Sequence, residues 1–430
     1  MSTKELNTYA LHALTQSGAE KAEAILTRTE KTEMNLENGA LKLIRTTVDH
    51  HLRLTALQNQ RRGSLLLNKS DRSVVDAAVQ EVLAIAAAAA PDPAHDIAEY
   101  QPAKTFNKGG TAPDLDLMYQ RFKTFTSEVA AEFPRIVLLN AHLDFTRQTT
   151  CFQNSNGVDF TVNQGGYRFA VTFSAQEGPG SSSFNHTGFF TLDLDEELLN
   201  GGSLRILLDQ ANRGQTPRKS PGKFTGEVLI TPDCLEDFLH FLLEITISDG
   251  PLIAGTSPFR HSLNQLVVSP RLTLACCPVA PEISSGYFIT SDGYEAQNAT
   301  IFANGVLKSF LLSQYGARRT GLPRGANDGG AFVVTPGDHP LTVIMKKVKK
   351  GLLLNRFSGG APSPNGDFSG VAKNSFYIED GKIQYPLSET MIAGNLISLF
   401  QSIAAVSRER IDFGSALLPW IHAHGVTISG

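Results

Sequence analysis

Hydrophobic and polar residues alternate along two long stretches of the chain, residues 22–67 and 136–194. Alternation with a period of two is typical of strands that bury only one face. Turn residues interrupt both stretches, at Glu37-Asn38-Gly39 and Arg61-Arg62-Gly63 in the first and at Asn154-Ser155-Asn156-Gly157 in the second. Each stretch is therefore predicted to form an antiparallel meander.

Apolar residues recur at helical spacing on either side of the first meander. A short amphipathic helix is predicted at the N-terminus, ending near Ser17-Gly18. Ser70-Asp71 is expected to begin a second helix that continues through Ala90, and a third is expected over residues 114–132, before Pro134. The N-terminal half is thus predicted to combine antiparallel meanders with two to three helices.

Residues 212–223 are polar, basic and rich in proline and glycine, which indicates a linker. We place a boundary there, between an N-terminal α+β domain over 1–215 and a C-terminal, mainly antiparallel β domain over 222–430. After the linker, a strand over 227–230 leads into a helix that Thr231-Pro232-Asp233 begins. Strands and helices are grouped rather than alternating regularly, so the fold class is predicted to be α+β.

Length and composition restrict the functional classes. With 430 residues, 41% hydrophobic and 19% charged, the chain is expected to bury a large core rather than remain disordered. A net charge of −4 gives no electrostatic reason to bind nucleic acid. The N-terminal segment lacks the apolar core of a signal peptide, and the run Val82–Ala90 is too short to span a bilayer. We expect a cytoplasmic protein whose four cysteines are reduced thiols.

Catalytic signatures are missing from the sequence. No histidine is followed by glutamate, and the serine-hydrolase elbow, the phosphate-binding loop and the dinucleotide fingerprint are absent. The most unusual segment is RFSGGAPSPNGDFSG, residues 356–370, whose glycines permit close approach by another chain. Composition alone leaves two interpretations of this segment, a binding loop or a surface loop that is shaped only by its turns.

Four segments together resemble the TldD/PmbA family, whose members are also called modulators of DNA gyrase. They are the stretch GDFSGVAKNSFYIEDGKIQYPLSETMIAGNL, the ending FGSALLPWIHAHGVTISG, the central NSNG turn and the pattern DGYEAQNATIFANGVLKSFLLSQYGARRTGLP. The resemblance covers nearly the whole chain. Within the family, the sequence is more similar to the PmbA branch, also called TldE, than to the TldD branch.

The resemblance bears directly on zinc chemistry. Members of the TldD branch carry H-E-x-x-x-H on a helix and a cysteine near the C-terminus, which together provide zinc ligands and a general base. At the matching positions this chain has His240 for the first ligand, Phe241 for the glutamate, Ile245 for the second histidine and Phe413 for the cysteine. The resemblance therefore implies a non-catalytic chain without a cofactor, zinc being expected only in a TldD-type partner.

His240 has two interpretations at the level of sequence. It can be a hydrogen-bonded histidine of a core or interface, or one ligand of a rearranged metal site that takes partners from His261, His422 and His424. His422 and His424 are two residues apart, so in a strand both rings point to the same face. Glu236 and Glu244 flank His240 at helical spacing and are predicted to be exposed charges.

The resemblance implies a function in peptide processing. A PmbA/TldE-like chain is expected to pair with a TldD-like metalloprotease subunit, to bind unfolded or modified peptides as an added β-strand in a channel, and to form a homodimer when alone. Neither nucleic acid nor membrane is an expected partner. We predict that Asn365, Gly366, Asp367, Phe368 and Ser369 line the peptide channel. The alternatives are an active metallopeptidase with an altered site around His240 and, less well supported by the acidic composition, a regulator of DNA gyrase.

Overall fold

The computed structural model describes residues 2–37, 39–69, 71–177, 180–213, 216–388 and 390–430. It has two large β-sheets with helices packed on them, so the predicted α+β class is confirmed. Three predicted features fall partly outside the described residues: the first turn at Asn38, the helix start at Ser70 and the linker at residues 214–215. The assignment of 1–215 and 222–430 as domains stays a prediction.

The first sheet contains the two predicted meanders, but the predicted turn at Arg61-Arg62-Gly63 is wrong: these residues begin β3, and the turn lies at Asn59-Gln60. Its strand order is β3-β2-β1-β5-β6-β4, and β7 and β8 also pair with β6. All of these pairings are antiparallel except that of β4 with β6. The bounds are β1 (Lys21–Glu37), β2 (Ala40–Gln58), β3 (Arg61–Leu67), β4 (Lys104–Lys108), β5 (Ile136–Asn154), β6 (Asp159–Glu177), β7 (Gly180–Ser181) and β8 (Asn185–Thr191).

Two groups of helices cover this sheet. The first pair, α1 (Thr3–Gln16) and α2 (Arg72–Ala88), buries its apolar side chains against β1, β2 and β3. The second pair, α3 (Leu115–Glu132) and α4 (Leu204–Asn212), packs with the short 3-10 helix η1 (Leu198–Asn200) on β5 and β6. Sequence periodicity missed α4, which is only nine residues long and directly precedes the polar linker segment.

In the described residues the second sheet has 13 strands, and most of its pairings are antiparallel. Two pairs, β9 with β14 and β13 with β21, are parallel, which the sequence did not predict. The bounds are β9 (Phe224–Ile230), β10 (Leu274–Cys276), β11 (Ala299–Ala303), β12 (Val306–Leu307), β13 (Phe332–Val334), β14 (Lys350–Leu354), β15 (Arg356–Gly359), β16 (Asp367–Lys373), β17 (Phe376–Glu379), β18 (Lys382–Pro386), β19 (Met391–Asn395), β20 (Ala405–Asp412) and β21 (Leu417–Ser429).

The helix α5 (Pro232–Thr246) is the centre of the C-terminal core. Pro232 occupies its first turn, where a missing backbone N–H has no cost, and one side of the helix is buried in the largest apolar cluster. The other helices here are short: α6 (Asp249–Ala254), α7 (Gln314–Thr320), α8 (Leu341–Met345) and α9 (Leu396–Gln401). Side chains from α8 pack in a second cluster with Leu229 and Trp420.

The segment 356–370 differs from the loop predicted from its glycines and prolines. Its two ends are strands, β15 and β16, which pair with each other, so only residues 360–366 connect them. In β16, Phe368 is buried while Asp367 and Ser369 are exposed, and this alternation is typical of a strand with one buried face. The loop was predicted from the glycines and prolines of the segment, and the alternation that indicates β16 is too short to stand out beside them.

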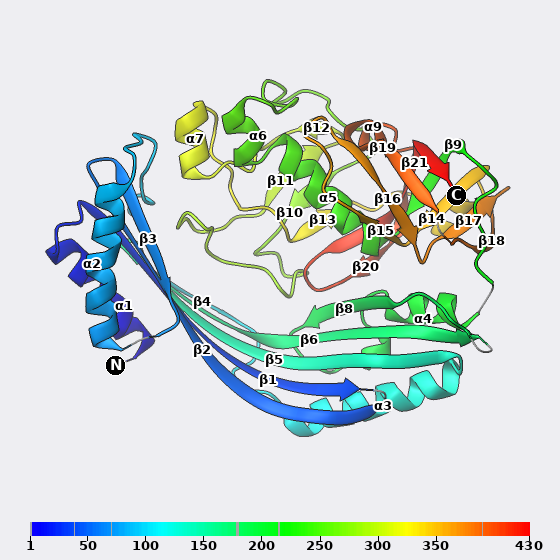
Figure 1. Cartoon of the computed structure of the whole chain (residues 1–430), viewed down its shortest axis with the longest axis horizontal. Coiled ribbons are helices and arrows are strands. Elements are labelled where there is room, and N and C mark those ends of the chain that lie inside the picture. The colour runs from blue at the N-terminus through cyan, green and yellow to red at the C-terminus, as the bar shows by residue number, and fades with distance from the viewer. Residues whose placement is uncertain (1, 38, 70, 178–179, 214–215, 389) are drawn as a thin grey trace.

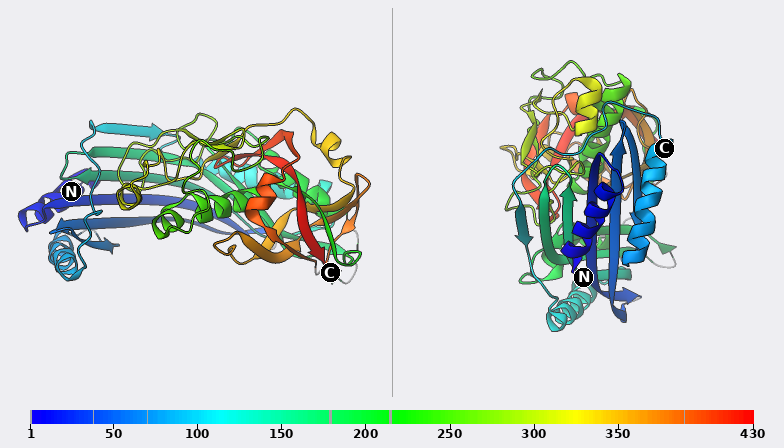
Figure 2. Two further views of the ribbon diagram at one scale, coloured as in Figure 1. Left: turned by 90° about the horizontal axis from the view of Figure 1, so that it is seen from above. Right: turned by 90° about the vertical axis from the view of Figure 1, so that its left-hand side faces the viewer.

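The first sheet is long and curved, and the C-terminal half lies against its concave side (Figure 1). The strands run from the end that carries α1 and α2 to the end beneath the C-terminal half (Figures 1 and 2). An apolar cluster joins the two halves, in which Phe288, Ile289 and Tyr294 contact side chains of β4, β5 and β6. The rings of Phe106 and Phe288 stack with their centroids 5.0 Å apart.

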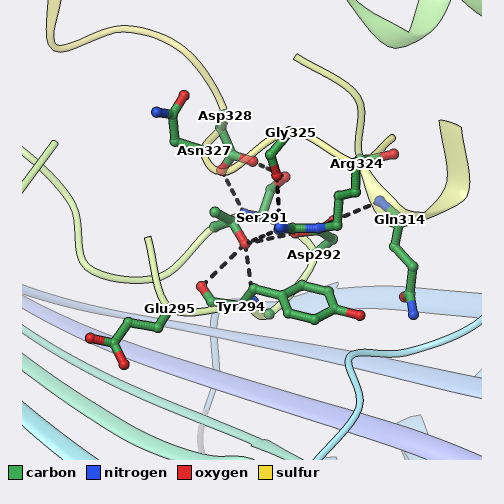
Figure 3. A network of polar contacts seen from close by, with 12 residues as sticks. Ser291, Asp292, Tyr294, Glu295, Gln314, Arg324, Gly325, Asn327 and Asp328 are labelled. Atoms are coloured by element: carbon green, nitrogen blue, oxygen red, sulfur yellow. Dashed lines mark hydrogen bonds and ion pairs between the residues drawn. The ribbon is translucent and has the colours of Figure 1, made fainter. Parts of the chain in front are cut away.

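A polar network strengthens this junction (Figure 3). Arg324 donates hydrogen bonds to both carboxylate oxygens of Asp292, at 2.9 and 2.6 Å, and its guanidinium lies over the ring of Tyr294. The same loops bind the first half directly: Gln101 donates to the carbonyl of Gly293 at 2.9 Å, and Gln314 donates to that of Ile97 at 3.2 Å. The network therefore fixes how the C-terminal loops sit on the first sheet.

One buried carboxylate lies near this junction. Glu23 lies in β1 between Thr55 and Asn154 and is only 7% exposed. Within the described part of the chain, its carboxylate has no hydrogen-bond partner. Burial raises the pKa of Glu23 to about 7, although the charges of Arg62 and Arg53 act in the opposite direction.

Candidate functional site

A cleft of about 700 Å³ lies between the first sheet and α5. Strands β5, β6 and β8 provide one wall, and Glu236, Ser285, Phe413 and Ser415 provide the other. A smaller hollow of about 240 Å³ shares residues 186–188, Glu236 and Phe413 with it and extends toward residues 355–357. The two hollows together form one groove, which we call the α5 cleft.

The polar face of α5 supplies acidic groups to this cleft. Asp233, Glu236, Asp237 and His240 are spaced by three or four residues, so they lie on one side of the helix. Glu236 lines both hollows, which corrects its predicted role as an exposed charge. Asp233 and Asp237 were missed in the sequence analysis, although the spacing of acidic residues opposite the apolar side of α5 was a signal for them.

These carboxyl groups have raised pKa values. Burial raises the pKa of Asp233, while hydrogen bonds from Ser203 at 2.5 Å and Thr187 at 3.1 Å act to lower it. Burial also raises the pKa of Glu236, and the charges of Asp237 and Asp233 add to the effect. Burial raises the pKa of Asp237 as well, so all three acidic groups hold their protons more strongly than they would in water.

His186 and Arg356 form the polar contact across the smaller hollow. Nδ1 of His186 lies 2.5 Å from the guanidinium of Arg356, which can only donate hydrogen bonds. The imidazole is therefore neutral, with its proton on Nε2. Consistent with this, burial lowers the pKa of His186, and the Arg356 charge lowers it further. Neither residue was singled out from the sequence.

The two halves meet closely at one end of the cleft. The backbone N–H of Phe190, in β8, donates to the carbonyl of Phe413 at 2.9 Å. Gly414 follows with a φ of +73°, and a Cβ built on it would lie 1.9 Å from the carbonyl oxygen of Phe190. Glycine is required there both by the left-handed backbone and by the contact.

The four positions predicted to be degenerate do not fit a zinc ion. His240 is exposed at the edge of the Phe332 ring, with centroids 4.6 Å apart, and Phe241 and Ile245 pack against the apolar core. Phe413 is 7% exposed and lines the cleft. One imidazole among phenyl and alkyl groups provides a single donor, whereas zinc sites in proteins use three or four.

The predicted partners of His240 are elsewhere. His422 and His424 lie in β21 beside Glu227 of β9. In the described part of the chain, these three residues form the group whose potential metal-ligand atoms lie close together. The group does not include His240 or His261. The ring of His240 contacts that of Phe332, and its role as a core or interface histidine stays a prediction.

The predicted peptide-binding residues surround the β15–β16 connection. Asp367 accepts hydrogen bonds from Asn395 and Asn365, both at 2.9 Å, and Gly366 has a φ of +93°. Phe368 points into the core, where its ring meets Phe238 of α5 and Phe357 of β15. Phe357 itself lines the smaller hollow. The structure thus connects this segment to the cleft through one aromatic ring, and its role in binding stays a prediction.

Comparison with known proteins gives a consistent result. Residues 222–430 match the family described as the PmbA/TldA metallopeptidase C-terminal domain. The chain is 24% identical to the metalloprotease PmbA homolog of Haemophilus influenzae, over 95% of this chain and 93% of that protein. It is 25% identical to metalloprotease PmbA of Escherichia coli O157:H7, over 94% and 92% of the two chains.

Two solved structures have the same fold. TldE from Thermococcus kodakarensis superposes with a TM-score of 0.80 at 17% identity, covering 99% of both chains. A putative modulator of DNA gyrase from Bacteroides thetaiotaomicron superposes with a TM-score of 0.85 at 22% identity, covering 99% of this chain and 98% of that one. In the described residues, no helix is both long enough and apolar enough to cross a membrane.

Proposed function

Because the chain belongs to the PmbA/TldD family, as its sequence suggested, we propose that it is a non-catalytic, TldE-like subunit of a zinc metalloprotease system. In this proposal the α5 cleft binds an unfolded or modified peptide, and a TldD-like partner supplies the zinc and the hydrolysis. The observation that carries the proposal is a large cleft beside α5. On this helix, Phe241 and Ile245 stand where the TldD branch has its glutamate and its second histidine, and both pack against the apolar core.

The shape of the cleft supports binding of an extended chain. Strand β8 pairs with β6 along one side, and on its other side Phe190 already donates a backbone hydrogen bond to a segment of the C-terminal half. Backbone groups two residues apart in a strand point the same way, so those of residues 186 and 188 face the cleft side as well. A peptide that lies along β8 would extend the sheet by one strand.

The edge of β2 supports assembly with a second chain. Strand β3 pairs only with residues 52–58 of β2, and residues 40–51 have no strand on that side in the described part of the chain. Apolar side chains along this edge are exposed, among them Leu43, Ile44 and Val48. Such an edge is a template for pairing with another chain, so we expect a homodimer in light scattering when the protein is alone.

Hydrolysis should require the partner. The purified chain is expected to leave an unfolded peptide intact, and addition of a zinc-loaded TldD-like subunit is expected to produce cleavage products detectable by mass spectrometry. Cleavage by the chain alone that is lost in His240→Ala would instead identify an active metallopeptidase with an altered site. The same peptide-cleavage assay therefore distinguishes a non-catalytic subunit from an active metallopeptidase.

Filling the cleft should abolish peptide binding. Ser285 is exposed and lines the cleft, so Ser285→Trp would place an indole in the groove without disturbing the core. We expect the Kd for a labelled unfolded peptide, measured by fluorescence anisotropy, to rise about tenfold or more, which corresponds to a loss of about 1.4 kcal/mol. In the same assay, a double substitution of Asp367 and Ser369 by alanine should weaken binding with a melting temperature changed by only a few degrees.

Two comparisons make this test specific. Glu282 is also exposed but does not line the cleft, so Glu282→Trp should bind peptide as the wild type does. Equal affinity of the Ser285→Trp and wild-type proteins would contradict the placement of the peptide. Unchanged affinity of the Asp367 and Ser369 variant, together with a large loss of stability, would show that the β15–β16 segment is structural.

A further inference from the structure

Three potential metal ligands converge on the far side of the C-terminal sheet, away from α5. Strands β9 and β21 are antiparallel, with Glu227 directly opposite His424 and Leu229 opposite His422. Side chains directly opposite each other, and those two residues along a strand, share one face of a sheet. Glu227, His422 and His424 therefore point the same way, and their donor atoms all lie within 4.8 Å of one another.

This face is opposite to the one that α5 covers. Leu229 and Trp420, the neighbours of the three residues on the same face, belong to the apolar cluster beneath α8. Val228 and Ala423, which alternate with them, belong to the core that contains α5. The cluster is thus separate from the α5 cleft and from the positions that match the family's zinc ligands.

The side chains are already held in place by their surroundings. Nε2 of His422 lies 2.6 Å from Oε2 of Glu227, and the other oxygen of Glu227 accepts the backbone N–H of Lys349 at 3.0 Å. Nδ1 of His424 lies 3.9 Å from the same Oε2. His422 is 3% exposed, whereas half of the His424 side chain is exposed, so one side of the group is open to solvent.

We propose that Glu227, His422 and His424 bind a divalent zinc ion. Two imidazoles and one carboxylate are a common zinc donor set, and three protein ligands leave the fourth position for water. Donor atoms around tetrahedral zinc are about 3.3 Å apart, given bonds of about 2.0–2.1 Å. A small rotation of the exposed His424 ring and a small separation of His422 from Glu227 would bring the three donors to that spacing.

One neighbouring charge opposes the ion and provides a test of its position. The ammonium group of Lys347 is near enough for its charge to act on His422, and its side chain is exposed. A cation bound by the three residues would be repelled by it. Removal of this charge by Lys347→Gln should therefore tighten zinc binding, an effect that an ion bound elsewhere on the chain would not show.

The test is zinc binding to the purified full-length chain. After metal is removed with a chelator, equilibrium dialysis against zinc with elemental analysis should give one zinc per chain. His424→Ala, at an exposed position, and Glu227→Gln, which keeps the side-chain shape, should each raise the Kd about tenfold or more. His240→Ala should bind zinc as the wild type does, because His240 is on the other side of the sheet.

The possible results separate clearly. Absence of stoichiometric zinc, or wild-type affinity in His424→Ala, would overturn the proposal, as would loss of zinc in His240→Ala alone. Circular dichroism should show that His424→Ala is folded, so that this variant decides the question even where Glu227→Gln is unstable. Peptide binding in the α5 cleft is measured separately and is expected to be unaffected by His424→Ala.

Discussion

Gly414→Ala is expected to lower the free energy of unfolding by about 2–5 kcal/mol and to weaken peptide binding at the same time. At a φ of +73°, an alanine is strained, and its Cβ would lie 1.9 Å from the carbonyl oxygen of Phe190. The Cβ position is fixed by the backbone of residue 414, and the oxygen belongs to the backbone of Phe190, so the clash can be relieved only by moving β8 away from residues 413–415. Because these segments form opposite walls of the α5 cleft, the movement should change its width.

Gly255→Ala is a matched control for this result. Gly255 has a φ of +74°, almost the same as Gly414, but nothing lies within 4 Å of the position that its Cβ would take. We expect it to lose only the conformational part, about 1–2 kcal/mol, and to bind peptide normally. Urea unfolding and fluorescence anisotropy measure the two properties. Equal losses of stability in the two variants would contradict a role for the Gly414–Phe190 contact in closing the cleft.

Glu23→Gln is expected to stabilise the protein by about 3 kcal/mol at pH 8 and to have little effect near pH 4. Burial raises the pKa of Glu23 to about 7 in the folded chain, above the ordinary value of 4.5. Between these two values the unfolded chain is ionised while the folded chain holds the proton, so the wild type loses stability as the pH rises through this window. Glutamine carries no charge at any pH and avoids this loss.

The measurement is the free energy of unfolding of both proteins in urea from pH 4 to pH 8. All other titrating groups are shared, so the difference between the two curves isolates Glu23. Glu81→Gln, at an exposed position of α2, is the control for the removal of one carboxylate from the chain. Parallel curves for Glu23→Gln would show that the buried carboxylate is ionised in the folded protein and stabilised by Arg62 and Arg53.

Sequence periodicity predicted the first sheet well because its strands are long and bury one face. β1, β2, β5 and β6 each have 17 to 19 residues. Over that length the alternation of apolar and polar residues is clear despite local exceptions. Short elements were harder to detect. The helix α4 has nine residues, and β16 begins inside a segment whose glycines and prolines suggested a loop. The parallel pairs of the second sheet depend on contacts between distant residues and leave no local pattern.

The candidate site was only partly predictable. Sequence spacing placed His240 on a helix with an apolar side, and the resemblance to the family identified Phe241, Ile245 and Phe413 as substitutions at zinc-binding positions. The cleft itself could not be found this way, because His186 and Arg356 come together from strands far apart in the sequence. The role of Glu236 depends on β8 lying across from α5, which no property of the helix reveals.

The order in which the first sheet is assembled has a consequence for refolding. β1 pairs with β2, the next strand along the chain, and β5 likewise pairs with β6, but the centre of the sheet joins β1 to β5, with Glu23 opposite Asn154. The chain between β1 and β5 is long, so bringing these two strands together costs conformational entropy before their contacts form. Pairing of residues distant in sequence makes folding slow for this reason. Until β1 and β5 meet, two long strand edges are exposed, and dilute, cool conditions should favour recovery of the native chain over aggregation.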